Sequence, residues 1–197
     1  MNLGGRKSPG AGLYTPAPMT GTNSREHSFD ASAWRVAIVA ARFNAVLVDQ
    51  LVDGATRAWS AHGGRPDELV VVHTPGAFEL PLAALKFAAS GLYHAVIALG
   101  CVIRGDTPHF EYVAGECARG LMDAGLASGV PVIFGVLTTE TQAQAEERAA
   151  ITRMNKGGES MEAALEMIEL LDPFGAPRAR TTKRPANRKA KRRGRRG

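Results

Sequence analysis

Short apolar runs alternate with longer segments of helical periodicity along the middle of the chain. The apolar runs are rich in β-branched residues and end at Gly, Pro or polar residues, a pattern typical of buried strands. They occupy residues 35–40, 69–73, 94–100 and 131–137. Between and after these runs, apolar residues recur every three or four positions, which predicts helices. The predicted helices cover about 45–62, 78–90, 108–127, 140–150 and 158–171.

Three positions carry signals that start helices. Asn44 suits the N-cap of the first predicted helix, because its short polar side chain accepts hydrogen bonds from free amides. Thr107 is the expected N-cap of the third helix, with Pro108 at the first helical position, where a missing N–H is harmless. Thr139 and Gln142 have the spacing of a capping box. Each signal places a helix directly after a predicted strand.

This alternation predicts an α/β fold. The strand segments are almost continuously apolar, as expected when helices cover both faces of a parallel sheet. We therefore expect a parallel four-stranded sheet in a three-layer αβα sandwich. Ligands of such sheets bind beyond the carboxyl ends of the strands. The candidate site is therefore lined by four loops, at residues 41–44, 75–79, 101–109 and 138–140.

The third of these loops carries the most specific chemistry. It joins a buried strand to a helix start, so its backbone N–H groups form an arrangement that binds anions. His109 lies in the first turn of that helix, beside the same opening. A phosphate cradle next to an imidazole indicates proton transfer on a phosphorylated substrate. The alternative is a helix start with a merely solvated histidine.

The 197 residues are expected to form one domain with two tails. Residues 1–33 are rich in Gly, Pro, Ser and Thr and are predicted to be a disordered extension, followed by the domain at 34–173. Residues 1–24 contain no acidic residue, which leaves a transit peptide as an alternative, and Met19 is an alternative start. The remaining residues, 174–197, form a basic tail.

The net charge of +5 is the sum of a basic C-terminal segment and an acidic remainder. Residues 178–197 hold 11 of the 24 Lys and Arg residues and no acid, leaving 13 basic against 19 acidic residues in the rest, a net charge of −6. Such a tail is predicted to be disordered and self-repelling. It is suited to binding nucleic acid without sequence preference, although it lacks aromatic residues for base stacking.

The remaining composition indicates a cytoplasmic protein without a metal. Cys101 and Cys117 are too few for a disulfide framework or a zinc site, and we expect both to be small buried residues. The five histidines show no metal-ligand spacing, and no apolar run is long enough to cross a bilayer. Membrane partners are therefore not expected.

Seven short motifs occur in the predicted loops and helix starts. They are Arg42-Phe43-Asn44, Pro75-Gly76-Ala77-Phe78-Glu79-Leu80-Pro81, Gly100 through His109, Pro131-Val132-Ile133-Phe134-Gly135, Thr138-Thr139-Glu140, Glu147-Arg148-Ala149 and Asn155-Lys156-Gly157-Gly158. In this order and spacing the chain resembles the lumazine synthase family over residues 34–171. The resemblance implies a flavodoxin-like fold.

The resemblance also implies a reaction, the penultimate step of riboflavin biosynthesis. 5-Amino-6-ribitylaminouracil condenses with 3,4-dihydroxy-2-butanone 4-phosphate to give 6,7-dimethyl-8-ribityllumazine, phosphate and water. No cofactor is implied, and His109 would be the catalytic proton shuttle. Family members form pentamers or icosahedral capsids of pentamers, and the short link after Arg148 favours the capsid. Riboflavin synthase is a further implied partner.

The resemblance assigns one group of residues to the aminouracil. Phe43 would stack on the pyrimidine ring, the alternative being an ordinary core Phe. Ala77, Phe78 and Glu79 would line the ribityl chain, with the Glu79 carboxylate accepting hydroxyl hydrogen bonds. Three successive residues would contact the ring through backbone groups: Cys101, Val102 and Ile103.

A second group would bind the phosphate and complete the site. Asp106 and Thr107 would flank the phosphate, and Arg148 would grip it with its guanidinium fork. For Arg148 the alternative is a surface ion pair. Phe134 would close the site from a neighbouring subunit, with Lys156 near it. The implied protein is therefore a homo-oligomer whose site is shared between subunits.

Two other classes of function remain open at this stage. A flavodoxin-like module that only binds a flavin needs a Ser/Thr-rich phosphate loop after the first strand, where this chain has Arg42-Phe43-Asn44. A nucleic-acid-packaging protein would depend on the basic tail. Deleting residues 178–197 separates the last class from the enzyme, because an enzyme would keep its activity without them.

Overall fold

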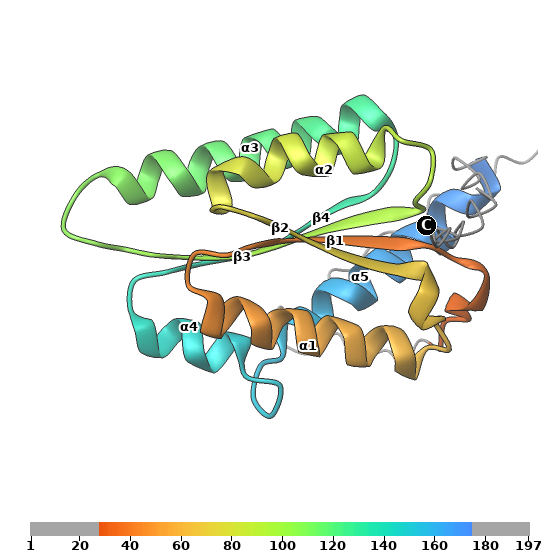
Figure 1. Ribbon diagram of the computed structural model, residues 1–197, viewed down its shortest axis with the longest axis horizontal. Helices are drawn as coiled ribbons and strands as arrows, with labels where there is room; N and C mark the ends of the chain where they lie inside the picture. Colours follow the sequence, from red (N-terminus) through yellow and green to blue (C-terminus); the bar gives the residue numbers. More distant parts are fainter. Residues whose placement is uncertain (1–27, 175–197) are drawn as a thin grey trace, which may run out of the picture.

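The computed structural model describes residues 28–174 as a four-stranded sheet between two layers of helices (Figure 1). All strand pairs are parallel and the strand order is β2-β1-β3-β4. This order confirms the predicted three-layer αβα sandwich of flavodoxin-like topology. The strands are β1 (Val36–Ala41), β2 (Leu69–Thr74), β3 (Ala95–Ile103) and β4 (Val132–Thr139).

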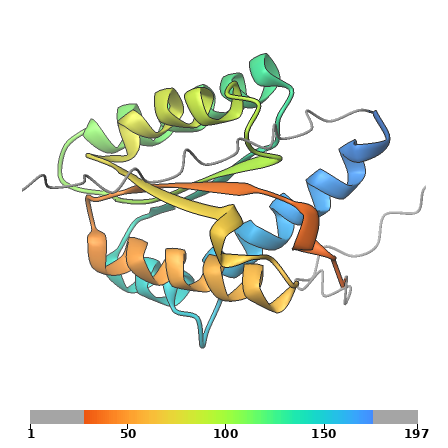
Figure 2. The same ribbon diagram turned by 45° about the vertical axis from the view of Figure 1, so that its right-hand side comes forward.

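Five α-helices cover the two faces of the sheet. Figures 1 and 2 show α2 and α3 on one face and α1, α4 and α5 on the other. Their bounds are α1 (Ala45–Ala61), α2 (Leu80–Ala88), α3 (His109–Ser128), α4 (Gln142–Ala149) and α5 (Lys156–Leu171). Short 3₁₀ turns lie at Ala31–Ala33, Pro66–Glu68, Ala77–Glu79 and Asp172–Phe174. The predicted second helix is therefore split into a 3₁₀ turn and the shorter α2.

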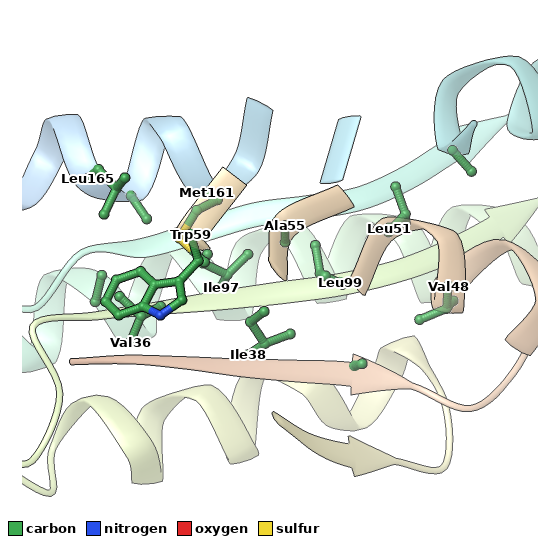
Figure 3. Close-up of a cluster of buried hydrophobic side chains, with 14 of the residues drawn as sticks. Val36, Ile38, Val48, Leu51, Ala55, Trp59, Ile97, Leu99, Met161 and Leu165 are labelled. Atoms are coloured by element: carbon green, nitrogen blue, oxygen red, sulfur yellow. The ribbon is translucent and has the colours of Figure 1, made fainter. Parts of the chain in front are cut away.

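Each face of the sheet has its own hydrophobic core. Every residue of β1 is buried, because β1 lies between two strands and under helices on both sides. In the core between the sheet and helices α1 and α5, Trp59 and Met161 pack against Ile38 and Ile97 of the sheet (Figure 3). The second core packs α2 and α3 on the opposite face. Burial on both faces explains the continuous apolar strand pattern.

The contact between α1 and α5 depends on a glycine. A Cβ atom on Gly157 would overlap the backbone carbonyl of Leu51, so only glycine permits this approach. Asn155 precedes it as the N-cap of α5, and its side chain accepts a hydrogen bond from the N–H of Gly158 at 3.2 Å. The helix thus begins at Lys156, two residues before the predicted start at Gly158.

The predicted start of the fourth helix is wrong. The strand β4 extends to Thr139, which pairs with Ile103 of β3, so Thr139 cannot cap a helix. The N-cap of α4 is Thr141, whose side chain accepts from the N–H of Gln144. The pairing of these two strand ends also makes β3 end three residues later than predicted, at Ile103.

The start of α3 also differs from the prediction at Thr107. The N-cap is Pro108, α3 begins at His109, and the cap has no side-chain hydrogen bond. Asn44 does occupy the N-cap of α1, as predicted. Its side-chain amide donates to the carbonyl oxygen of Cys101 instead, and it makes no side-chain cap bond.

The described chain starts at residue 28, upstream of the expected boundary at Trp34. Phe29 and Ala31 are buried against the core below α1, which explains why the fold includes them. The rest of the predicted N-terminal extension, and the basic tail from residue 175, lie outside the described residues. Within residues 28–174, no helix is both long and apolar enough to cross a membrane.

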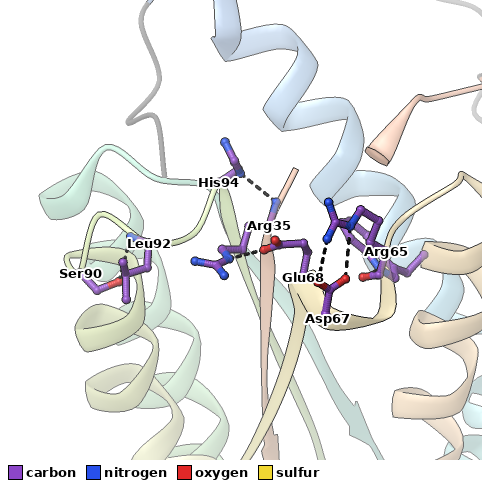
Figure 4. Close-up of polar contacts among 8 residues, drawn as sticks. Arg35, Arg65, Asp67, Glu68, Ser90, Leu92 and His94 are labelled. Carbon is purple, nitrogen blue, oxygen red and sulfur yellow. Dashed lines mark hydrogen bonds and ion pairs between the residues drawn. The ribbon is translucent and has the colours of Figure 1, made fainter. Parts of the chain in front are cut away.

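A cluster of charged residues and one histidine lies at the amino ends of the strands (Figure 4). Arg35 forms an ion pair with Glu68, and its backbone N–H donates to Nδ1 of His94 at 2.8 Å. Arg65 pairs with Asp67 at 2.7 Å. The hydrogen bond from Arg35 requires an unprotonated Nδ1, so this end of the sheet depends on a neutral imidazole.

This arrangement predicts a stability loss in mild acid. The pKa of His94 is lowered from its ordinary value of 6.5, chiefly because the imidazole is partly buried. A histidine with a lowered folded pKa stabilises the fold fully above pH 6.5 and loses that contribution as pH falls through the folded pKa. The free energy of unfolding should therefore decrease from pH 7 towards pH 5. In urea titrations, His94→Asn should show a shallower decrease, because it keeps an acceptor that does not titrate.

The control is His73→Asn, which changes an exposed histidine at the end of β2. It should reproduce the pH dependence of the unmodified protein. An unchanged pH dependence in His94→Asn would contradict the assignment of the acid sensitivity to His94.

Candidate functional site

A cavity of about 600 Å³ opens at the carboxyl ends of the strands. Three of the four predicted loops line it, together with the first turns of α3. Nine expected site residues meet there: Phe43, Ala77, Phe78, Glu79, Cys101, Val102, Ile103, Thr107 and His109. The fourth loop, residues 138–140, does not line the cavity. The strand ends therefore place most of the predicted residues around one opening.

Three lining residues were missed by the sequence analysis. Phe110, Tyr112 and Val113 contribute from the first turns of α3. They follow His109 in the first turns of the same predicted helix. Positions three and four residues after His109 lie on the same face of a helix, so helical periodicity could have placed Tyr112 and Val113 beside it. Tyr112 is 68% exposed, so the cavity has an open aromatic rim.

Four expected residues lie outside this cavity. Asp106 is exposed in the loop but is not part of the lining. Phe134 and Lys156 line a second hollow of about 320 Å³ between β4 and α5. Arg148 lies on α4, and its guanidinium donates to the carbonyl oxygen of Gln144 at 3.0 Å. Among residues 28–174 it forms no ion pair, which contradicts the alternative interpretation as a surface pair.

The loop that carries Phe43 is fixed to β3. The Nδ2 of Asn44 donates to the carbonyl oxygen of Cys101 at 2.9 Å. The Phe43 side chain is 70% exposed, so it is not an ordinary core residue. A large exposed apolar ring on a fixed loop offers a flat surface to a ligand.

Glu79 is held in place by its own turn. Its Oε2 accepts a hydrogen bond from the N–H of Gly76 at 2.9 Å. Thr74 stabilises the same turn by donating its hydroxyl to the carbonyl oxygen of Gly76 at 3.0 Å. The second carboxylate oxygen of Glu79 has no partner within residues 28–174 and is available to accept a hydrogen bond at the cavity.

Both cysteines are buried, as predicted. Burial raises the pKa of Cys101 and of Cys117 to about 11. Both thiols therefore remain protonated at neutral pH, and Cys101 contributes shape to the cavity rather than a nucleophile. Within the described part of the chain, no three His, Cys, Asp or Glu side chains form a group suited to a metal ion.

The cavity combines three kinds of group that suit a particular ligand. Phe43, Phe78 and Tyr112 supply exposed aromatic surface for a flat ring. Glu79 accepts hydrogen bonds from hydroxyl groups, and the start of α3 favours an anion. His109 adds an imidazole, a type of side chain that enzymes use for proton transfer. These features define an α/β protein that binds a small ligand at the carboxyl edge of its sheet.

Comparisons with known proteins agree with this class and make it specific. The model of the 6,7-dimethyl-8-ribityllumazine synthase family matches residues 33–172. The chain is also 50% identical over 147 residues to the 6,7-dimethyl-8-ribityllumazine synthase of Nitratidesulfovibrio vulgaris, a match that covers 75% of this chain and 94% of that relative. The chain therefore belongs to the 6,7-dimethyl-8-ribityllumazine synthase family, a family of transferases of riboflavin biosynthesis.

Proposed function

We propose that this enzyme condenses 5-amino-6-ribitylaminouracil with 3,4-dihydroxy-2-butanone 4-phosphate. The products are 6,7-dimethyl-8-ribityllumazine, phosphate and water. The observation that carries the proposal is that Phe43, Glu79 and His109 line one cavity at the carboxyl edge of the sheet. This cavity offers a stacking surface, a hydroxyl acceptor and a proton shuttle to the two substrates.

His109 serves as the proton shuttle. The amine attacks the ketone carbonyl, and water leaves as the imine forms. Phosphate is then eliminated, and the second ring closes with loss of another water. Every step moves a proton between nitrogen, oxygen and carbon, which suits an imidazole at neutral pH. Holding the two substrates side by side supplies much of the remaining acceleration.

The aminouracil occupies the aromatic part of the cavity. Its ring stacks on Phe43, and backbone groups of residues 101–103 contact the ring edge. Its ribityl chain lies along Ala77, Phe78 and Glu79. The free carboxylate oxygen of Glu79 accepts from the ribityl hydroxyls, since the other oxygen is already bonded to Gly76.

The phosphate of the second substrate lies at the start of α3, beside Asp106 and Thr107. The N–H groups of an uncapped helix start are free to bind its oxygens. Arg148 adds a charged fork from a neighbouring subunit. Phe134 closes the same site from the neighbour, with Lys156 near it.

A shared site requires a homo-oligomer. Two observations support one. Phe134, Lys156 and Arg148 lie away from the cavity of their own chain. Large apolar side chains are also exposed on α3, with Met122 at 64% and Leu126 at 77%, and such exposure is typical of surfaces that another chain covers. We propose a cytoplasmic pentamer, assembled into an icosahedral shell, with riboflavin synthase as a partner that uses the product.

The basic tail gives a second proposed partner, nucleic acid. Its 11 Lys and Arg residues lie within residues 178–197, without any acid to offset them. Binding to phosphates would release counterions, which makes it independent of sequence and sensitive to salt. The described chain ends at the amino edge of the sheet, opposite the candidate site (Figure 1).

An activity assay with and without the tail tests both proposals. The full chain and a chain ending at residue 177 should form the lumazine at equal rates, followed by its fluorescence. Only the full chain should bind a labelled oligonucleotide at low salt, with affinity falling steeply as salt rises. No product above the uncatalysed rate would contradict the enzyme, and equal oligonucleotide binding by both chains would contradict the role of the tail.

A further inference from the structure

The helix start that carries His109 has no side-chain cap. Pro108 occupies the N-cap, and the first turn is closed by a hydrogen bond from the N–H of Glu111 to the Pro108 carbonyl oxygen at 3.1 Å. Within residues 28–174, neither Asp106 nor Thr107 makes a side-chain hydrogen bond. Uncapped helix ends fray, so His109 would move with the first turn unless another contact held it.

Arg104 supplies that contact. Its backbone N–H donates to the carbonyl oxygen of Thr139 at 2.9 Å, so its backbone continues the pairing of β3 with β4. Its Nη1 donates to both carboxylate oxygens of Glu111, at 2.7 and 2.9 Å. Its Nε donates to Glu140 at 2.6 Å. One side chain thereby joins the end of β3, the first turn of α3 and the junction of β4 with α4.

The same guanidinium also packs on the aromatic lining of the cavity. Its Cζ lies 4.2 Å from the ring centroid of Phe110, a cation–π contact. Phe110 and Glu111 are the two residues that directly follow His109. The planar fork of Arg104 therefore holds the two residues that follow the histidine, a geometry that a lysine ammonium cannot reproduce.

We propose that Arg104 is a positioning residue that fixes the first turn of α3, and with it His109, against the carboxyl edge of the sheet. The proposal rests on the proposed function for its effect on catalysis. Its structural part stands without that function, because the ties to Glu111, Glu140 and Phe110 exist in the folded chain. Arg104 acts through His109 and does not itself line the cavity.

Hydrogen exchange tests the structural part without any substrate. In Arg104→Gln, the amides at the start of α3 should exchange at least about tenfold faster, because the first turn opens more often. The matched control is Arg119→Gln, which also removes an arginine paired with two carboxylates, Glu116 and Asp123, on the same helix. It should leave those amides unchanged. Equal exchange in the Arg104 variant and the unmodified protein would overturn the proposal, whatever the enzyme does.

Steady-state kinetics test the catalytic part. Arg104→Gln should lower kcat about tenfold with little change in the KM for the aminouracil, because a misplaced catalytic group slows the chemical step more than the binding of a substrate that does not contact the helix start. Glu111→Gln should reproduce this loss, and Arg104→Lys should recover little of it. In a His109→Ala background, Arg104→Gln should have no further effect, since residues that act through one another are not additive.

The outcomes separate the two proposals. Faster exchange with an unchanged kcat would overturn the positioning role. A tenfold loss that persists in the His109→Ala background would also overturn it, because the effect would then not pass through His109. If the unmodified protein forms no lumazine, the proposed function fails while the exchange experiment still decides whether Arg104 fixes the helix start.

Discussion

Replacing His109 with alanine should lower kcat by roughly a hundred- to a thousandfold. The imidazole lines the cavity and is exposed, and within residues 28–174 it makes no hydrogen bond that the substitution would break. The free energy of unfolding should therefore change by no more than about 0.5 kcal/mol. Lumazine fluorescence under saturating substrates measures the loss, and urea titration measures the stability.

The control for this variant is His73→Ala, which removes an exposed histidine outside the cavity lining. Its kcat should match that of the unmodified protein. A His109→Ala enzyme that keeps its kcat would show that the protons move by another route.

Replacing Arg148 with alanine should raise the KM for the butanone phosphate by about 10- to 100-fold. A hydrogen bond between charged groups contributes about 1.5–3 kcal/mol, which corresponds to this range. The KM for the aminouracil should change little, because Arg148 is proposed to contact only the phosphate, which the aminouracil lacks. Initial rates with one substrate varied at a time separate the two values.

Arg153→Ala is the matched control for this loss of charge. Arg153 is an exposed arginine in the turn between α4 and α5, five residues further along the chain. It should leave both KM values unchanged. An equal rise of KM in both variants would indicate a general effect of surface charge instead of a phosphate contact.

The sheet and the order of elements could be predicted because burial on both faces requires each strand to be an almost continuous apolar run. A buried parallel strand such as β1 must be apolar throughout, and the helices that cover it must be amphipathic. The site loops followed from the same logic, since parallel strands place all their carboxyl ends at one edge. Nine of the expected residues line one cavity for that reason.

Element ends were harder to predict because they depend on contacts between distant segments. Thr139 belongs to β4 because Ile103 pairs with it, and no local pattern records that partner. The helix start at His109 is held by Arg104 from the end of β3, whereas the sequence pattern favoured a cap at Thr107. Arg104 forms ion pairs with both Glu111 and Glu140, which lie on two other segments of the chain.

The positions of Phe134, Arg148 and Lys156 outside the cavity could not be predicted from the sequence either. A motif states which residues belong to a site but not which copy of the chain supplies them. Two hollows on one chain, one with His109 and one with Phe134 and Lys156, are what a site divided between neighbours would leave.

The most direct test of the central claim is to mix two impaired variants and to assay them at a butanone phosphate concentration far below the KM of the Arg148→Ala enzyme. His109→Ala and Arg148→Ala, coexpressed at equal levels with different tags, should form mixed oligomers after purification through both tags. If each site takes His109 from one subunit and Arg148 from the next, about a quarter of the sites in a random mixture hold both residues, and lumazine formation should recover to about that fraction of the unmodified rate. Mixed oligomers that are no more active than the two variants alone would contradict a shared synthase site.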